Sequence, residues 1–144
     1  MWVDALLLLS DAQAVSADAA STNTIDLGGT NKTIGDGEPL AVLFTVDVGA
    51  DYTTTDETYE FQIIQSANAN LSSPDILVRR AISAASLGLA AGTRVSVSLP
   101  FGTPTKRYLG AYYDVGGTTP SLTVTAFLGP LRFIERMTYY PGVF

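Results

Sequence analysis

Polar and apolar residues alternate in several short segments of this chain. In residues 58–65, Tyr59, Phe61 and Ile63 fall on one side and Glu60 and Gln62 on the other. This period of two is typical of antiparallel strands with one buried face and one face in water. A more continuous apolar run, residues 40–48, also favours a strand. We therefore predict strands at 40–48, 58–65, 76–83, 93–99, 108–115 and 121–128, with a further candidate at 21–25.

Segments rich in Gly, Pro, Asn and Asp separate these runs and predict turns. They are residues 49–55, 68–74, 88–92, 100–105 and 116–120. Short strands at such regular spacing predict an all-β fold, either a β-sandwich or a jelly roll. The chain shows no internal repeat and no long linker, so we predict a single β domain over residues 21–132.

The two ends of the chain depart from the alternating pattern. Residues 1–20 are rich in Ala and Leu and predict an N-terminal arm or a short helix capped by Ser10 or Asp11. The start imitates a signal peptide, but no Lys or Arg precedes its short apolar run, so we expect no cleaved leader. Residues 133–144 predict an aromatic C-terminal arm. No stretch approaches the roughly 18 apolar residues of a membrane span, so we expect no membrane partner.

Composition narrows the functional classes. Charged residues make up 15% of the chain, against about 25% in an average soluble domain. This low fraction favours a protein whose apolar surface is covered by a partner. The net charge of −6 argues against nucleic acid as that partner. The chain has no His and no Cys, and so lacks the usual general base, thiol nucleophile and zinc ligands. We expect no enzymatic activity, no cofactor and no metal.

Acidic and aromatic residues leave three alternatives open. Four carboxylates, those of Asp47, Asp51, Asp56 and Glu57, lie around one turn and have the oxygen chemistry of a Ca²⁺ site, but they lack the spacing of a dedicated calcium loop. We therefore favour a solvated acidic turn. The pairs Glu57–Glu60 and Asp56–Glu60 would act in glycoside hydrolysis only across a cleft. Glu60 shares a strand face with Gln62 and Glu57 lies nearer the turn, so the sequence does not place such a pair. Among the tyrosines, Tyr108, Tyr112 and Tyr113 could line a carbohydrate platform, although packing is the more usual role of such rings.

Six segments carry a family resemblance when they are taken in order. They are residues 9–15, 20–28, 37–40, 91–95, 107–109 and 116–126. In this order they resemble the small capsid cement (decoration) proteins of tailed bacteriophages, over about residues 4–128. The resemblance implies a jelly-roll protein that is made in the bacterial cytoplasm, binds the outside of an icosahedral head and bridges neighbouring major capsid subunits. The last residues, 137–144, look like an extension of the family pattern.

A cement protein would gain its binding free energy from buried apolar area and from arms that lie across neighbouring subunits. Aromatic residues are favoured at the centres of interfaces, which points to the two ends of the chain. Adjacent arginines in the strand at 76–83 would point to opposite faces, where one could pair with an acid on a partner or form an ordinary surface ion pair. The candidate capsid or self-association contacts are Trp2, Leu6, Leu8, Arg79, Arg80, Tyr139, Tyr140 and Phe144.

The combined expectation is a jelly-roll β-sandwich of antiparallel strands with extended N- and C-terminal arms, acting as a virion structural protein on the outer capsid surface. Its expected partners are the major capsid protein and further copies of itself, as a dimer or a trimer. One alternative is a carbohydrate-binding β-sandwich module on a phage or cell surface, which would use Tyr108 or Tyr112. Another is a ring-forming tail or head-completion protein, which copy number per particle would distinguish.

Overall fold

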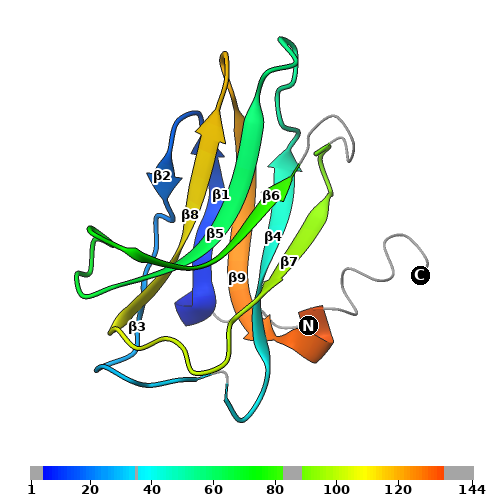
Figure 1. Ribbon diagram of the computed structural model, residues 1–144. Helices are drawn as coiled ribbons and strands as arrows, with labels where there is room; N and C mark the ends of the chain where they lie inside the picture. The colour runs from blue at the N-terminus through cyan, green and yellow to red at the C-terminus, as the bar shows by residue number, and fades with distance from the viewer. Residues whose placement is uncertain (1–4, 35, 83–88, 135–144) are drawn as a thin grey trace.

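The computed structural model describes residues 5–34, 36–82 and 89–134, which are nearly all β-structure (Figure 1). The six strands predicted from the alternating pattern are present, with boundaries that agree to within two residues. The elements are a 3-10 turn η1 (Ala5–Leu7) and strands β1 (Leu8–Val15), β2 (Ala19–Ala20), β3 (Ile25–Asp26), β4 (Leu40–Val48), β5 (Thr58–Ser66), β6 (Asp75–Ile82), β7 (Arg94–Ser98), β8 (Tyr108–Gly116) and β9 (Leu122–Pro130). Residues 131–134 are helical.

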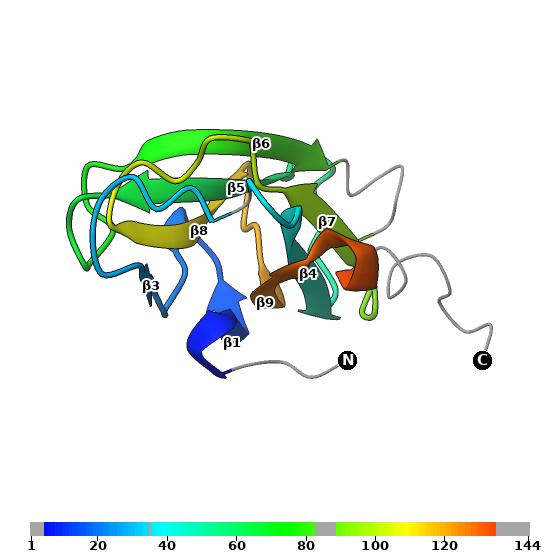
Figure 2. The same ribbon diagram turned by 90° about the horizontal axis from the view of Figure 1, so that it is seen from below.

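The strands form two antiparallel sheets that pack face to face (Figures 1 and 2). Sheet A has the order β1-β9-β4-β7, and sheet B has the order β2-β8-β5-β6, with β3 also paired to β8. If β2 and β3 are counted as one interrupted strand, each sheet has four strands. The chain then crosses between the sheets at every connection except the one from β5 to β6. This order is that of a jelly roll, and it confirms the predicted fold class.

The N-terminal segment differs from the arm or short helix that its composition predicts. After the three residues of η1, the chain forms β1 and pairs with β9 as an edge strand of sheet A. Leu9 and Val15 are both buried, but the register shifts twice between Leu8 and Gln13, and Ala12 has a φ of 47°. These bulges break the period of two, which is why alternation does not reveal this strand. The predicted strand at 21–25 is replaced by two short pairings, β2 and β3.

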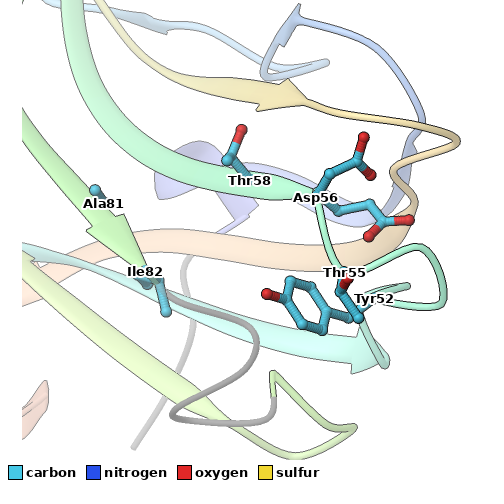
Figure 3. Close-up of a pocket in the computed structure, with 7 residues that line it drawn as sticks. Tyr52, Thr55, Asp56, Thr58, Ala81 and Ile82 are labelled. Carbon is cyan, nitrogen blue, oxygen red and sulfur yellow. The ribbon is translucent and has the colours of Figure 1, made fainter.

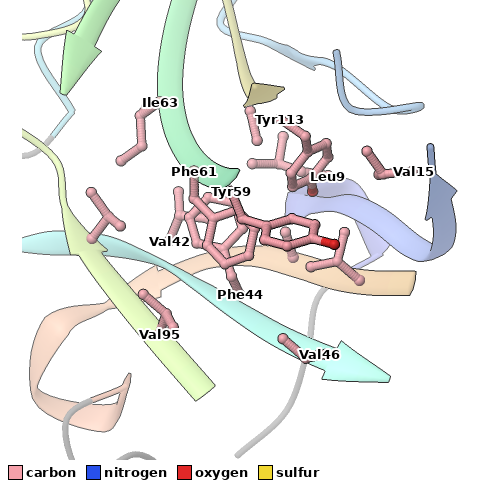
Figure 4. Packing of buried hydrophobic residues seen from close by; sticks show 14 of the residues in the cluster. Leu9, Val15, Val42, Phe44, Val46, Tyr59, Phe61, Ile63, Val95 and Tyr113 are labelled. Carbon is pink, nitrogen blue, oxygen red and sulfur yellow. The ribbon is translucent and has the colours of Figure 1, made fainter. Parts of the chain in front are cut away.

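The main core lies between the two sheets and is centred on three aromatic rings (Figure 4). Phe44 from sheet A stacks on Phe61 from sheet B with ring centroids 4.8 Å apart. Tyr113 meets both rings edge-on, at 6.0 and 5.9 Å. Its buried hydroxyl lies 2.7 Å from the Ser10 hydroxyl, so the phenol is not left without a partner. The aromatic positions of the alternating strands therefore join the two sheets.

A second, smaller cluster covers part of the outer face of sheet A. Ala41 and Leu43 of β4 lie with Phe127 of β9 beneath Ile134, which is fully buried. The helical residues that follow β9 thus fold back over the sheet, and Leu8 and Leu131 pack at the edge of this cluster. Because both faces of β4 are covered here, its sequence is a continuous apolar run and not an alternation.

Candidate functional sites

Both ends of the described chain reach the surface at one end of sheet A. We use the name terminal patch for the apolar residues Leu6, Leu8, Leu131 and Phe133, which lie next to these two ends in the sequence. The 3-10 turn η1 contacts β9, and residues 131–134 follow that strand directly (Figure 2). Leu6 is 81% exposed and Phe133 is 39% exposed. The sandwich therefore presents apolar side chains where its two ends emerge.

A polar rim borders the terminal patch. The Arg132 guanidinium lies over the Phe133 ring, 4.9 Å from its centroid, and its Nε is 3.1 Å from Glu38 Oε1. Glu38, Pro39, Leu131 and Arg132 line a hollow of about 280 Å³ beside it. An apolar centre with a polar, solvent-accessible rim is the usual anatomy of a protein–protein interface.

The predicted contact residues fall into three groups. Leu6 lies on the terminal patch, and Leu8 is half-buried against the second cluster. Arg79 and Arg80 are exposed on β6 and reach in different directions: Arg79 lines a hollow on sheet B, whereas Arg80 Nη1 donates to the Ser96 carbonyl oxygen of β7 at 2.9 Å. Arg80 thus links edge strands of the two sheets. The remaining candidates, Trp2, Tyr139, Tyr140 and Phe144, lie outside the described residues.

The outer face of sheet B carries a polar hollow of about 310 Å³. Gln62 of β5 lies opposite both Arg79 of β6 and Tyr112 of β8, so these three side chains come from neighbouring strands. Sequence reasoning singled out Tyr112 and Arg79 but did not bring them together, because cross-strand register is not visible in a single strand. The residues that line the hollow are Asp18, Gln62, Pro74, Ile76, Arg79, Tyr112 and Asp114.

The electrostatics of this hollow are dominated by carboxylates. The pKa of Asp114 is raised by partial burial and by repulsion from Asp18 and Glu60, an effect that Arg79 opposes. Burial also raises the pKa of Tyr112. The hollow therefore combines an aromatic ring, one guanidinium and closely spaced acids, which are groups that suit a polyhydroxylated or cationic ligand.

The second tyrosine of the hypothetical carbohydrate platform lies apart from this hollow. The Tyr108 ring lies against Arg107, whose Cζ is 5.2 Å from the ring centroid. Arg107 in turn forms a two-point ion pair with Asp26, at 2.8 and 3.0 Å. This pair is the largest cause of the lowered pKa of Asp26, which falls to about 2. Tyr108 thus belongs to an ion-pair cluster on β3 and β8.

The four carboxylates of the acidic turn do not gather at one point. Asp47 accepts a hydrogen bond from Thr125 of sheet A, and Asp51 accepts one from the Thr53 amide at 3.0 Å. Asp56 joins the turn to the β8–β9 connection, accepting from the Thr118 amide at 3.0 Å and the Thr118 hydroxyl at 2.9 Å. Within the described residues, no group of three or more His, Cys, Asp or Glu side chains is arranged to hold a metal ion.

A pocket of about 450 Å³ opens beside this turn (Figure 3). Tyr52, Thr55, Asp56, Glu57 and Thr58 line it from the turn and the start of β5, and Ala81 and Ile82 line it from the end of β6. Glu57 is buried in this region, whereas Glu60 lies on the outer face of sheet B, where it accepts from Gln62 Nε2 at 2.7 Å. These two acids therefore do not face each other across this pocket, as a pair for glycoside hydrolysis would have to.

In the part of the chain that the structure describes, no helix is both long enough and apolar enough to cross a bilayer.

A family model described as Bbp16 matches residues 9–128. The match spans both sheets and ends within β9, so the terminal patch lies just outside it. The chain has no match among the curated proteins.

Proposed function

The chain belongs to the Bbp16 family, and we propose that it is a non-enzymatic virion structural protein that cements an icosahedral phage head. In this proposal it binds the outer surface of the shell, bridges neighbouring major capsid subunits and associates with further copies of itself. The six segments that resemble phage cement proteins all lie within the residues matched by the family model. The low charged fraction of the chain supports a protein with much of its surface covered by partners.

The observation that carries the proposal is the terminal patch. A rigid sandwich that presents apolar side chains where both ends of its described chain emerge can dock on one subunit while its ends extend toward others. Apolar burial contributes roughly 25 cal/mol per Å² before ordering costs, so a modest patch suffices when many copies bind cooperatively around a lattice. The ion pair between Arg132 and Glu38 lies at the rim, where it would favour one docking orientation.

The direct test is the copy number and position of the chain in purified virions, measured by quantitative mass spectrometry and cryo-electron microscopy. Hundreds of copies on the outer shell are expected for a cement protein, and about a dozen for a ring-forming tail or head-completion protein. Heads that carry the protein should also survive heating better than heads that lack it. Equal survival, or absence from the shell, would contradict the proposal.

A matched pair of variants tests the role of the terminal patch. Leu6→Asp places a charge in the patch, whereas Val48→Asp places one on a 59% exposed side chain at the opposite end of sheet A. We expect Leu6→Asp to weaken binding to heads about tenfold or more, because an unpaired charge would be buried at the interface, and Val48→Asp to bind normally. Equal effects of the two substitutions would place the docking surface elsewhere.

Carbohydrate binding is a second candidate function, favoured by the hollow on sheet B that contains Tyr112, Arg79 and Asp114. An aromatic ring beside carboxylates and a guanidinium can stack on a sugar and bind its hydroxyl groups. In this proposal, Tyr112→Ala abolishes binding on a glycan array and Tyr108→Ala does not, because Tyr108 lies outside the hollow. No binding by the unaltered protein would reject this function.

A further inference from the structure

One buried polar atom in the acidic turn lacks a partner. Glu57 is only 3% exposed, and its Oε2 is the single buried side-chain N or O atom among the described residues that has no hydrogen bond. A buried carboxylate is costly unless it is paired, hydrogen-bonded or coordinated to a metal ion. The position of Glu57 therefore calls for a further ligand.

The groups around Glu57 and Asp56 offer fewer hydrogen-bond donors than there are oxygen acceptors. The other oxygen of Glu57, Oε1, accepts from the Thr54 amide at 3.3 Å and from the Thr54 hydroxyl. The same hydroxyl also has Asp56 Oδ1 at 2.7 Å and the Thr118 carbonyl oxygen at 3.2 Å. A hydroxyl carries one hydrogen, so it can satisfy only one of these three acceptors fully.

The segments that form the turn bring no cationic side chain to this excess of oxygen atoms. Residues 49–58 and 116–121 contain no Lys or Arg. The ion pairs of Lys106 with Asp75, Arg107 with Asp26 and Arg132 with Glu38 lie outside this turn. The turn thus concentrates negative charge around a partly desolvated carboxylate.

We propose that the acidic turn binds a calcium ion through the carboxylates of Glu57 and Asp56. Both carboxylates lie within hydrogen-bonding reach of the same hydroxyl, and both residues line the same pocket. Calcium accepts six to eight oxygen ligands, including carbonyl and hydroxyl oxygens and water, so two carboxylates with the neutral oxygens of Thr54 and Thr118 form a suitable set.

The ion would hold the turn against the β8–β9 connection, because Asp56 already bonds to Thr118 there. Flexible loop ligands favour calcium over magnesium, which demands near-ideal octahedral geometry. This site is independent of the proposed cement function, since it lies at the end of sheet A opposite the terminal patch. Its role would be to stiffen one end of the sandwich.

The experiment uses the full chain and two probes. Terbium, which replaces calcium at oxygen sites, should show luminescence sensitised by Tyr52, which lines the pocket, and calcium should displace it. With a dissociation constant of about 0.1–1 mM, as in weak extracellular sites, about 5 mM calcium should raise the melting temperature by roughly 3–9 °C over a chelated sample. Magnesium at the same concentration should give a smaller rise. Absence of both the luminescence and the calcium shift would overturn the proposal.

A pair of isosteric variants identifies the site. Glu57→Gln removes the charge and supplies N–H donors to the acceptor-rich turn, so it should lose the calcium shift while melting no lower than the unaltered protein in chelator. The control Glu60→Gln changes the same side chain on the outer face of sheet B and should keep the full shift. A full shift in Glu57→Gln would place calcium elsewhere. If Glu57→Gln fails to fold, terbium binding by the unaltered chain still decides whether the protein binds the ion.

Discussion

The outer faces of the two sheets differ in what covers them. On sheet A, Leu43 and Phe127 are buried beneath Ile134 from the helical residues after β9. On sheet B, the corresponding surface carries Arg79, Tyr112 and Asp114 around an open polar hollow. In the same two-sheet scaffold, part of one outer face is thus covered by the helical residues after β9, whereas the other outer face carries an open hollow.

This difference shows how coverage is encoded along the strands. In β4, the four residues from Ala41 to Phe44 are all buried, and the strand reads as a continuous apolar run. In β8, Tyr113 and Val115 face the core, whereas Tyr112 and Asp114 face outward, and the strand alternates. A covered outer face removes the selection for polar side chains, whereas an open face retains it. Loss of alternation therefore marks where the chain folds back on itself.

The largest expected effect is on the covered face. Leu43→Ala should lower the free energy of unfolding by about 2–5 kcal/mol, because it leaves a cavity between β4 and Ile134. Arg79→Ala on the open face should change it by no more than about 0.5 kcal/mol. Urea denaturation of both variants measures the two values. A loss below about 1 kcal/mol for Leu43→Ala would mean that residues 131–134 do not cover a true core.

A smaller effect is expected on the outer face of sheet B, at the point where the Leu71 side chain packs against Gly110. A Cβ on Gly110 would lie 2.4 Å from Leu71 Cδ1, and Leu71 is 4% exposed. Gly110→Ala should therefore cost about 1–3 kcal/mol through overpacking. In a Leu71→Ala background the same substitution should cost almost nothing, which a double-mutant cycle in urea would show. An unchanged cost would mean that Leu71 does not close this part of the face.

The smallest expected effects concern the open face and its rim, and they are measured as proton titrations. Asp26 should titrate near pH 2, below its ordinary pKa of 3.8, because Arg107 and the Gly28 amide bond to its charged form. Asp114 should titrate above its ordinary pKa, because burial and its acidic neighbours disfavour its charge. Carboxyl carbon NMR across the acid range measures both, and Arg107→Ala should return Asp26 toward 3.8.

The two shifts have opposite consequences for stability. The contribution of Asp26 is present above about pH 4 and is lost as the pH falls toward 2, since its folded pKa is depressed. Asp114 binds its proton more tightly in the folded state, so its contribution is present below its ordinary pKa and is lost as the pH rises through the raised value. Titration of both carboxyls near 3.8 would contradict this account of the open face.

Much of the fold follows from local pattern, and the exceptions have local causes. The strands β4 to β9 are recognisable because their period of two or their apolar run survives in the sequence. Strand β1 is not, because two register shifts between Leu8 and Gln13 interrupt the alternation and bury the neighbours Leu9 and Ser10 together. Composition predicted contacts at the two ends of the chain, but it did not show that Ile134 is buried over sheet A while its neighbour Phe133 stays 39% exposed.

The sequence by itself therefore determined the class of this protein: antiparallel β-strands, low charge, and neither His nor Cys. These properties are local or compositional, and each can be read without knowing which segments touch. Only the tertiary structure decided the jelly-roll strand order, the cover over sheet A, the meeting of Gln62, Arg79 and Tyr112, and the unpartnered oxygen of Glu57. Each of these depends on contacts between residues far apart in the chain, and a repeat of two residues specifies which face a side chain takes but not which strand lies beside it.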